Sequence, residues 1–161
     1  MADDLLYAYL AGAIDADGCI SVKRSTYAMR VRGDAGAPIY SERVMLKQVT
    51  PDIPRLLRET FGGSLRVDRP STSRGKPLYA WQATDLRAVE CLRAILPHLR
   101  IKRAQAENCL ALRDLKEASK RAKVERGRGH MGSAPRPAAL TEAMEARFTN
   151  AKALNQVGRA A

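Results

Sequence analysis

The chain has 161 residues, of which 28 are lysine or arginine and 17 are aspartate or glutamate, so its formal net charge is +11. This length accommodates one hydrophobic core, which favours a single domain with an appended arm over two domains. Such an excess of positive charge points to an acidic polymer as the partner, with nucleic acid the leading candidate. A basic structural or ribosome-associated protein would carry the same charge, so charge alone leaves both alternatives open.

The cysteines and the apolar segments predict an intracellular protein. Cys19, Cys91 and Cys109 are odd in number and widely spaced, which argues against a disulfide framework or a zinc site and suggests small buried residues. The chain begins with Asp3 and Asp4 instead of a basic segment, and no apolar run reaches membrane-spanning length. We therefore expect a cytoplasmic location, in contact with the nucleoid, and no membrane partner.

The first part of the chain is expected to form a helix followed by two strands. Apolar residues recur at three- and four-residue spacing before Gly18, which is typical of an amphipathic helix. These positions are Leu5, Leu6, Tyr9, Leu10, Ala13 and Ile14. From Cys19 to Ser25, and again from Pro38 to Gln48, apolar and polar residues alternate, which predicts two strands with one buried face each.

A second helix and a second pair of strands follow. Thr50 is expected to cap a helix that has Pro51 at its first position. Residues 64–69 and 78–84 are rich in strand formers, and a polar turn joins them. Trp81 is expected to lie inside, because an aromatic residue in a strand of a small domain is usually part of the core.

The remaining chain is predicted to be helical, with one basic linker. Asp85 is expected to cap a helix, and a further helix should extend over residues 102–118. Residues 119–138 are rich in lysine, arginine, glycine and proline and are interpreted as a linker. We therefore divide the chain into a domain over residues 1–118, this linker, and a C-terminal helical arm over residues 139–161.

This order of elements predicts an α+β domain with one antiparallel sheet, which buries one face against the helices. The other face is free to meet a partner, and the alternation of each strand identifies the side chains that project from it. They are Ser21, Lys23, Ser25, Arg43, Lys47, Arg66 and Asp68. Basic side chains at every second position of a twisted sheet can follow a nucleic-acid groove.

The most specific signal is a run of nine residues at the end of the first helix, Leu10-Ala11-Gly12-Ala13-Ile14-Asp15-Ala16-Asp17-Gly18. Small residues at Ala8, Ala11 and Gly12 leave room for a partner helix to approach closely. Asp15 and Asp17 lie in the last turn, where the helix dipole disfavours negative charge, so a positive group should offset them. A divalent cation such as Mg²⁺ takes one or two carboxylates together with phosphate oxygens, and it suits this position. Alternatively, either carboxylate accepts hydrogen bonds from backbone amides near the turn.

These nine residues resemble the signature of the LAGLIDADG homing endonucleases and differ from it only at Ala13. The resemblance implies an αββαββα fold with a saddle-shaped antiparallel sheet, followed here by C-terminal helices, and a site-specific endonuclease that cuts double-stranded DNA. It also implies that Asp17 binds Mg²⁺ or another divalent cation, with Gly18 in the same metal site. Because the chain has one copy of the motif, the resemblance implies a homodimer formed through the first helix and a pseudo-palindromic target. The dimer interface would contain Ala8, Ala11, Gly12 and Asp15.

The resemblance extends to two further catalytic residues. Gln48 ends the second predicted strand, where family members often have a glutamine that orders active-site water, although a shift of one residue would give this role to Lys47. Residues 96–106 are similar to a family segment whose lysine contacts the active-site solvent, which implies that Lys102 stabilises negative charge or helps to activate water. A lysine exposed at the start of a helix is the alternative interpretation.

Lysine and arginine side chains are expected to bind the DNA backbone, while strand side chains read the sequence in the major groove. The residues expected at the DNA are Ser21, Lys23, Arg24, Ser25, Arg30, Arg43, Lys47, Arg66, Asp68, Arg74 and Lys76, together with the basic segment from Lys120 to Arg128. The main alternative is a protein of the same fold that binds nucleic acid without cutting it, as an RNA maturase or a transcription regulator does. Asp17 together with Lys102 favours the enzyme, because a pure binder has no need for a carboxylate that repels phosphate.

Overall fold

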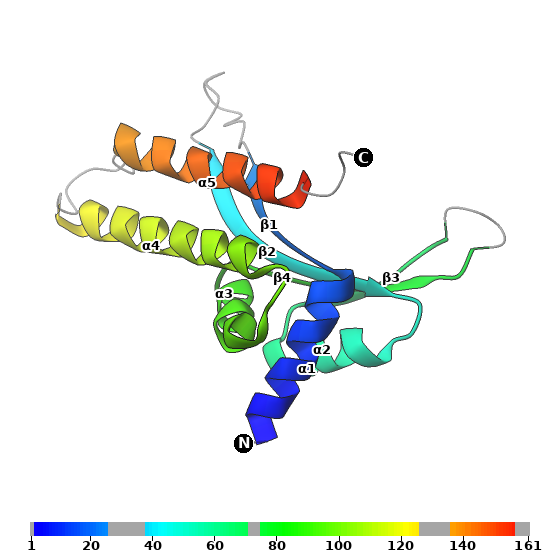
Figure 1. Cartoon of the computed structure of the whole chain (residues 1–161). Helices are drawn as coiled ribbons and strands as arrows, with labels where there is room; N and C mark the ends of the chain where they lie inside the picture. Colours follow the sequence, from blue (N-terminus) through cyan, green and yellow to red (C-terminus); the bar gives the residue numbers. More distant parts are fainter. Residues whose placement is uncertain (1, 26–37, 71–74, 126–135, 157–161) are drawn as a thin grey trace.

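The computed structural model describes residues 2–25, 38–70, 75–125 and 136–156 (Figure 1). Its elements in chain order are α1 (Ala2–Asp17), β1 (Gly18–Ser25), β2 (Ile39–Gln48), α2 (Asp52–Phe61), β3 (Ser64–Asp68), β4 (Leu78–Thr84), α3 (Asp85–Ile95), the short 3-10 helix η1 (Leu96–His98), α4 (Arg103–Glu125) and α5 (Ala138–Gln156). Within these described ranges, no helix is long and apolar enough to cross a membrane.

The four strands form one antiparallel sheet in the order β1-β2-β4-β3. All five α-helices contact this sheet or one another, with α1, α3 and α4 against β2, α2 against β4, and α5 against β1. Figure 1 shows the sheet as a curved band with the helices along one side. The predicted α+β class and the αββαββα order, with further helices at the C-terminal end, are therefore confirmed.

The core lies between the helices and one face of the sheet, where strand alternation directs apolar side chains inward. The buried strand residues include Ile20, Val22, Tyr40, Val44, Leu46, Trp81 and Ala83. Trp81 is fully buried, as expected, and its indole Nε1 donates a hydrogen bond of 2.8 Å to the carbonyl oxygen of Gly62. Two of the cysteines, Cys91 and Cys109, also lie in the core, where burial raises the pKa of both thiols to about 12.

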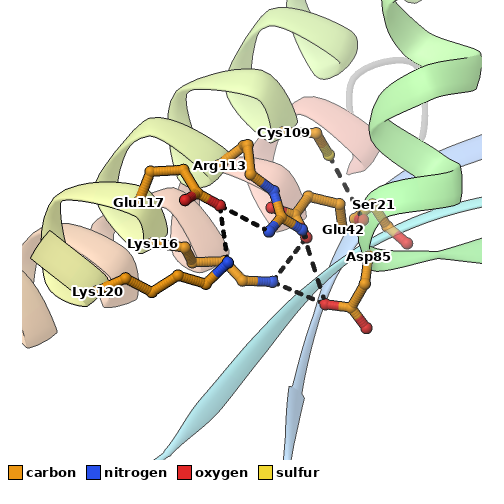
Figure 2. A network of polar contacts seen from close by, with 8 residues as sticks. All are labelled: Ser21, Glu42, Asp85, Cys109, Arg113, Lys116, Glu117 and Lys120. Carbon is orange, nitrogen blue, oxygen red and sulfur yellow. Dashed lines mark hydrogen bonds and ion pairs between the residues drawn. The ribbon is translucent and has the colours of Figure 1, made fainter.

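A charged network extends from the buried Glu42 and Arg113 to exposed residues at the edge of the core, and Figure 2 shows its side chains. Glu42 of β2 is fully buried, and its Oε2 atom accepts hydrogen bonds of 2.8 Å from Arg113 and from Lys116, both on α4. Lys116 also donates to Asp85, the first residue of α3, at 2.7 Å. The network therefore joins the central strand β2 to α3 and α4.

Two predicted helix starts are wrong. α2 begins at Asp52, so Pro51 is the residue before the helix and not its first position. Thr84, not Asp85, precedes the first turn of α3 as the N-cap. Asp85 has a positive φ of 52°, and its exposed carboxylate bonds to Lys116 of α4 instead of capping its own helix. A tertiary ion pair has replaced the local cap that the sequence suggested.

The C-terminal part is more closely integrated than the predicted linker and arm imply. α4 continues through Glu125, so the first residues of the predicted linker are helical. α5 packs against α4 and β1, and Met144 of α5 is buried in the main core. Asn108 of α4 reinforces this packing, because its amide donates to the carbonyl oxygen of Arg147 at 2.9 Å.

Candidate functional site

A sharp turn joins α1 to β1 and brings the end of the nine-residue motif to the sheet. α1 ends at Asp17, and β1 begins at Gly18, which lies opposite Leu46 of β2. A Cβ atom on Gly18 would lie 2.7 Å from the carbonyl oxygen of Ile14, which is closer than a side chain tolerates. The turn therefore requires glycine, and this requirement fixes where Asp17 is placed.

The Asp17 carboxylate meets the end of β2. The side-chain amide nitrogen of Gln48 donates a hydrogen bond of 2.8 Å to Oδ2 of Asp17. The other polar atom of Gln48, Oε1, is buried and has no hydrogen-bond partner in the described part of the chain. Lys47, the alternative to Gln48, bonds instead to Asp68 at 2.7 Å. Gln48 is thus the residue that contacts Asp17.

Lys102 binds backbone carbonyl oxygens at the C-terminal end of the same helix, α1. Its ammonium group donates to the carbonyl oxygen of Ile14 at 2.9 Å and also to that of Asp15, while the carbonyl oxygen of Ala16 lies 3.5 Å away. α1 has no basic residue in its own last turn, so Lys102 supplies the positive charge that the helix dipole favours there. The structure thereby places the Lys102 ammonium at the C-terminal end of α1, the helix that ends at Asp17, although the two residues come from opposite ends of the core domain.

Asp15 has a different role from Asp17. Its Oδ2 atom accepts backbone hydrogen bonds from Arg100 at 2.8 Å and from Ile101 at 3.2 Å, and its Oδ1 atom accepts one from Lys102 at 2.9 Å. Partial burial alone would raise the pKa of Asp15, but the three amides and the nearby ammonium lower it below its usual value. The backbone-bonding alternative is thus the one that Asp15 follows.

The end of α1 offers one exposed carboxylate to a cation. Within the described residues, no group of three or more His, Cys, Asp or Glu side chains is placed to hold a metal ion. One chain offers the exposed carboxylate of Asp17, beside Gln48, while both oxygens of Asp15 are occupied by amides. Magnesium accepts as few as one or two carboxylates and fills its shell with water and phosphate oxygens, so this donor set suits it.

The outer side of α1 carries an exposed stripe of apolar and small residues, which are Leu5, Ala8, Tyr9, Gly12 and Ala16. Leu5 is 75% exposed and Tyr9 is 56% exposed, although both are among the apolar positions from which the helix was predicted. No atom lies within 4 Å of a Cβ built on Gly12. This open stripe is available to a second helix.

Two residues predicted for the dimer interface do not belong to this stripe. Ala11 is fully buried, because it follows the side of α1 that carries Leu10 and Ile14. At 3.6 residues per turn, Ala11 lies about 100° from Gly12 around the helix axis. The side chain of Asp15 is directed at the backbone of residues 100–102. Ala8 and Gly12 are exposed as expected.

The face of the sheet opposite the helices carries the predicted polar side chains. Strand pairing aligns Ser21 with Arg43, and Lys47 with Ala80, which in turn pairs with Arg66. Paired residues point to the same face, so Lys23, Ser25 and Asp68 share it by alternation. Two of the cations are held in place by one carboxylate, since Asp68 accepts hydrogen bonds of 2.7 Å from both Lys47 and Arg66. These bonds lower the pKa of Asp68 below its usual value.

Arg24 is misplaced in the prediction. It alternates with Lys23 and therefore points to the helix-covered face, where its guanidinium pairs with Glu145 of α5 at 3.2 Å and lies 5.9 Å from the ring centre of Phe148. Arg30 and Arg74 lie outside the described residues. Lys76 is exposed in the segment before β4.

Sequence reasoning missed several polar residues on the open face. They are Ser64, Gln82 and Thr84, which the strand pairing places on the same side as Lys23, Arg43 and Lys47. The alternation of β4 contained the signal, because Gln82 and Thr84 flank Ala83, which is buried. A polar surface thus crosses all four strands.

Solved structures of known proteins share this architecture. Neither a protein-family model nor a curated protein sequence matches the chain. The homing endonuclease I-CvuI, in complex with the I-CreI target, aligns with a TM-score of 0.55 and 22% identity over 97% of this chain and 98% of its own. The group I intron-encoded homing endonuclease I-CeuI, complexed with DNA, aligns with a TM-score of 0.54 and 14% identity over 88% of this chain and 75% of its own. The I-LtrWI LAGLIDADG homing endonuclease, bound to target DNA, aligns with a TM-score of 0.51 and 17% identity over 92% of this chain and 58% of its own. At this identity the likeness is one of fold, and the chain has the fold of the LAGLIDADG homing endonucleases.

Proposed function

We propose that the protein is a homodimeric, metal-dependent endonuclease that hydrolyses one phosphodiester in each strand of a pseudo-palindromic DNA site. The observation that carries this proposal is the meeting of Asp17, Gln48 and Lys102 at the end of α1. A carboxylate at the end of α1, an amide at the end of β2 and an ammonium from the segment before α4 come together where α1 reaches the sheet. A protein that only binds DNA gains nothing from a carboxylate next to phosphate.

The three residues have complementary roles in the proposed reaction. Asp17 would hold a divalent cation, which when bound acts as a Lewis acid on the phosphate and on water. Gln48 keeps the Asp17 carboxylate in place, and by the family resemblance it would help to order a water molecule there. Lys102 is a fixed positive charge that stabilises negative charge developing on the phosphate oxygens. The related I-CvuI complexes were obtained in the presence of 2 mM magnesium or calcium.

The open face of the sheet would bind the DNA. It carries many basic and polar side chains, with Lys23, Lys47 and Arg66 exposed, so these can contact phosphates and base edges in the major groove. Two copies packed through α1 would place two such faces in one continuous surface. They would also place two Asp17 carboxylates near the symmetry axis, one for each strand.

A cleavage selection on a randomised duplex library tests the proposal. The wild-type protein is incubated with the library in magnesium and, as a control, in the metal chelator EDTA. Paired cuts on the two strands of a near-palindromic site, seen only with magnesium, are the expected result. Specific binding without cuts in magnesium or manganese would contradict the nuclease and support a non-cleaving maturase or regulator.

Replacing Gly12 with leucine is expected to convert the dimer to a monomer. The Gly12 position is open in one chain, so the larger side chain leaves the protomer fold intact, and the change from glycine favours the helix by about 1 kcal/mol. In a dimer formed through α1, the same side chain prevents close approach of the two helices. Sedimentation equilibrium measures the association state, and thermal unfolding confirms the fold.

Ala153→Leu is the matched control for this dimer test, because Ala153 is an exposed residue of α5. This variant should remain a dimer. A dimer that persists in Gly12→Leu, with an association constant equal to that of the control, would show that the interface lies elsewhere.

A further inference from the structure

We infer that Asp15 is a positioning residue that joins α4 to the end of α1 and so sets the place of the Lys102 ammonium relative to Asp17. The inference rests on the proposed nuclease function. It assigns the two aspartates of the motif to different tasks, with Asp17 facing the cation and Asp15 facing the protein backbone.

The contacts between the two helix ends are reciprocal. Asp15, in the last turn of α1, accepts hydrogen bonds from the three consecutive amides that precede α4, those of residues 100–102. The carbonyl oxygen of Lys102 accepts the first hydrogen bond of α4, from Ala106 at 3.1 Å. Lys102 therefore caps α4 with its backbone while its ammonium caps the carbonyls of α1.

The charges at this junction match the helix dipoles. The negative carboxylate lies at the N-terminal end of α4, and the positive ammonium lies at the C-terminal end of α1, which is the favourable arrangement at each end. Hydrogen bonds in which one partner is charged are stronger than neutral ones. These contacts hold the C-terminal end of α1 against the N-terminal end of α4, although the two helices are distant in sequence.

The contacts between the two helix ends determine the position of the Lys102 ammonium relative to Asp17. Asp17 is two residues beyond Asp15 and is held separately by Gln48, so its position follows from α1 and β2. The position of the Lys102 ammonium follows from the segment that Asp15 holds. Without the Asp15 carboxylate, this segment keeps only the contacts of the lysine side chain, and the distance from ammonium to reacting phosphate is no longer fixed. Displacements of about 1 Å in such groups can cost a hundredfold in rate.

The test compares Asp15→Asn with Asp114→Asn. Both variants remove one negative charge, and Asp114 is an exposed residue of α4 with no ion pair or side-chain hydrogen bond within the described part of the chain. Three quantities are measured under conditions where circular dichroism shows each variant folded. They are the single-turnover cleavage rate at saturating protein, the Kd for target DNA in EDTA, and the exchange rates of the amides at residues 100–102.

For Asp15→Asn we expect a cleavage rate lower by roughly tenfold to a hundredfold, with the Kd for DNA within about threefold of the Kd of Asp114→Asn. Faster amide exchange at residues 100–102 should accompany the loss of rate. Asp15→Glu, which keeps both acceptor oxygens on a longer side chain, should recover part of the rate, and it carries the test if the asparagine variant does not fold.

Two results would overturn the inference in distinguishable ways. If the wild type cuts DNA and the folded Asp15 variants cut equally fast, Asp15 has no positioning role and the nuclease function stands. If the wild type does not cut under any divalent cation, the proposed function fails, and the inference fails with it.

Discussion

Replacing Asp17 with asparagine is expected to lower the rate of DNA cleavage by about a hundredfold to a thousandfold, while the protein still binds its target. Asparagine has the shape of aspartate and keeps an oxygen that can accept the hydrogen bond from Gln48, so the turn before β1 is preserved. The variant lacks the negative charge that holds a divalent cation. DNA affinity should stay the same or rise, because one carboxylate no longer repels the phosphates.

Single-turnover kinetics in magnesium, together with equilibrium binding in EDTA, separate these two effects. Asp114→Asn is again the charge-matched control, and it should cut at the wild-type rate. The concentration of magnesium that gives half of the maximal rate should rise in Asp17→Asn and stay constant in the control. If Asp17→Asn cuts as fast as the wild type, a carboxylate other than Asp17 holds the cation. Loss of both binding and cutting would indicate that Asp17 has a structural role.

Local patterns in the sequence were sufficient to predict much of this architecture. The change from helical spacing to alternation at Gly18 predicted the α1–β1 junction, and the structure adds the reason, since no side chain fits beside Ile14 there. Strand alternation also predicted which side chains of β1 and β2 are buried. These features depend on backbone periodicity, which can be recognised from the spacing of apolar residues close together in the sequence.

The errors concern contacts made by distant parts of the chain. Arg24 was assigned to DNA because it is basic, but strand alternation directs it to α5, where it pairs with Glu145. Ala11 was assigned to the dimer interface because it is small, but a small residue also allows close packing inside the chain, and only the tertiary structure decides between the two. Asp15 was assigned to the dimer interface, whereas both of its carboxylate oxygens accept hydrogen bonds from the amides of residues 100–102.

The candidate site itself depends on such distant contacts. Gln48 and Lys102 were assigned by resemblance, and no spacing rule brings either of them to Asp17. Their convergence follows from the order β1-β2-β4-β3, which makes β2 the immediate neighbour of the motif, and from the segment that returns along α1 to the start of α4. The topology of the fold, and not the local sequence pattern, therefore brings Gln48 and Lys102 to the end of α1.

Replacing Glu42 with methionine is expected to destabilise the folded protein by about 3–5 kcal/mol. Alternation places Glu42 on the buried face of β2, and its carboxylate is fully buried between Arg113 and Lys116. Its removal leaves the guanidinium of Arg113, which is 6% exposed, with only the more distant carboxylates of Glu117 at 3.4 Å and Asp85 at 3.9 Å. The cost therefore comes mainly from a buried positive charge without its closest partner.

Chemical denaturation gives the free energy of unfolding, and a double-mutant cycle isolates the pair. The double variant Glu42→Met/Arg113→Met should be more stable than either single variant, because two apolar side chains replace the buried charges while Lys116 keeps its bond of 2.7 Å to Asp85. Glu107→Met is the control, since it breaks the exposed pair with Arg103 and should change the free energy of unfolding by less than about 1 kcal/mol. If the two single changes simply add in the double variant, Glu42 and Arg113 are not coupled, and the network does not hold β2 against α4. A positive coupling makes this network the element that fixes β2, and with β2 the position of Gln48, against α4.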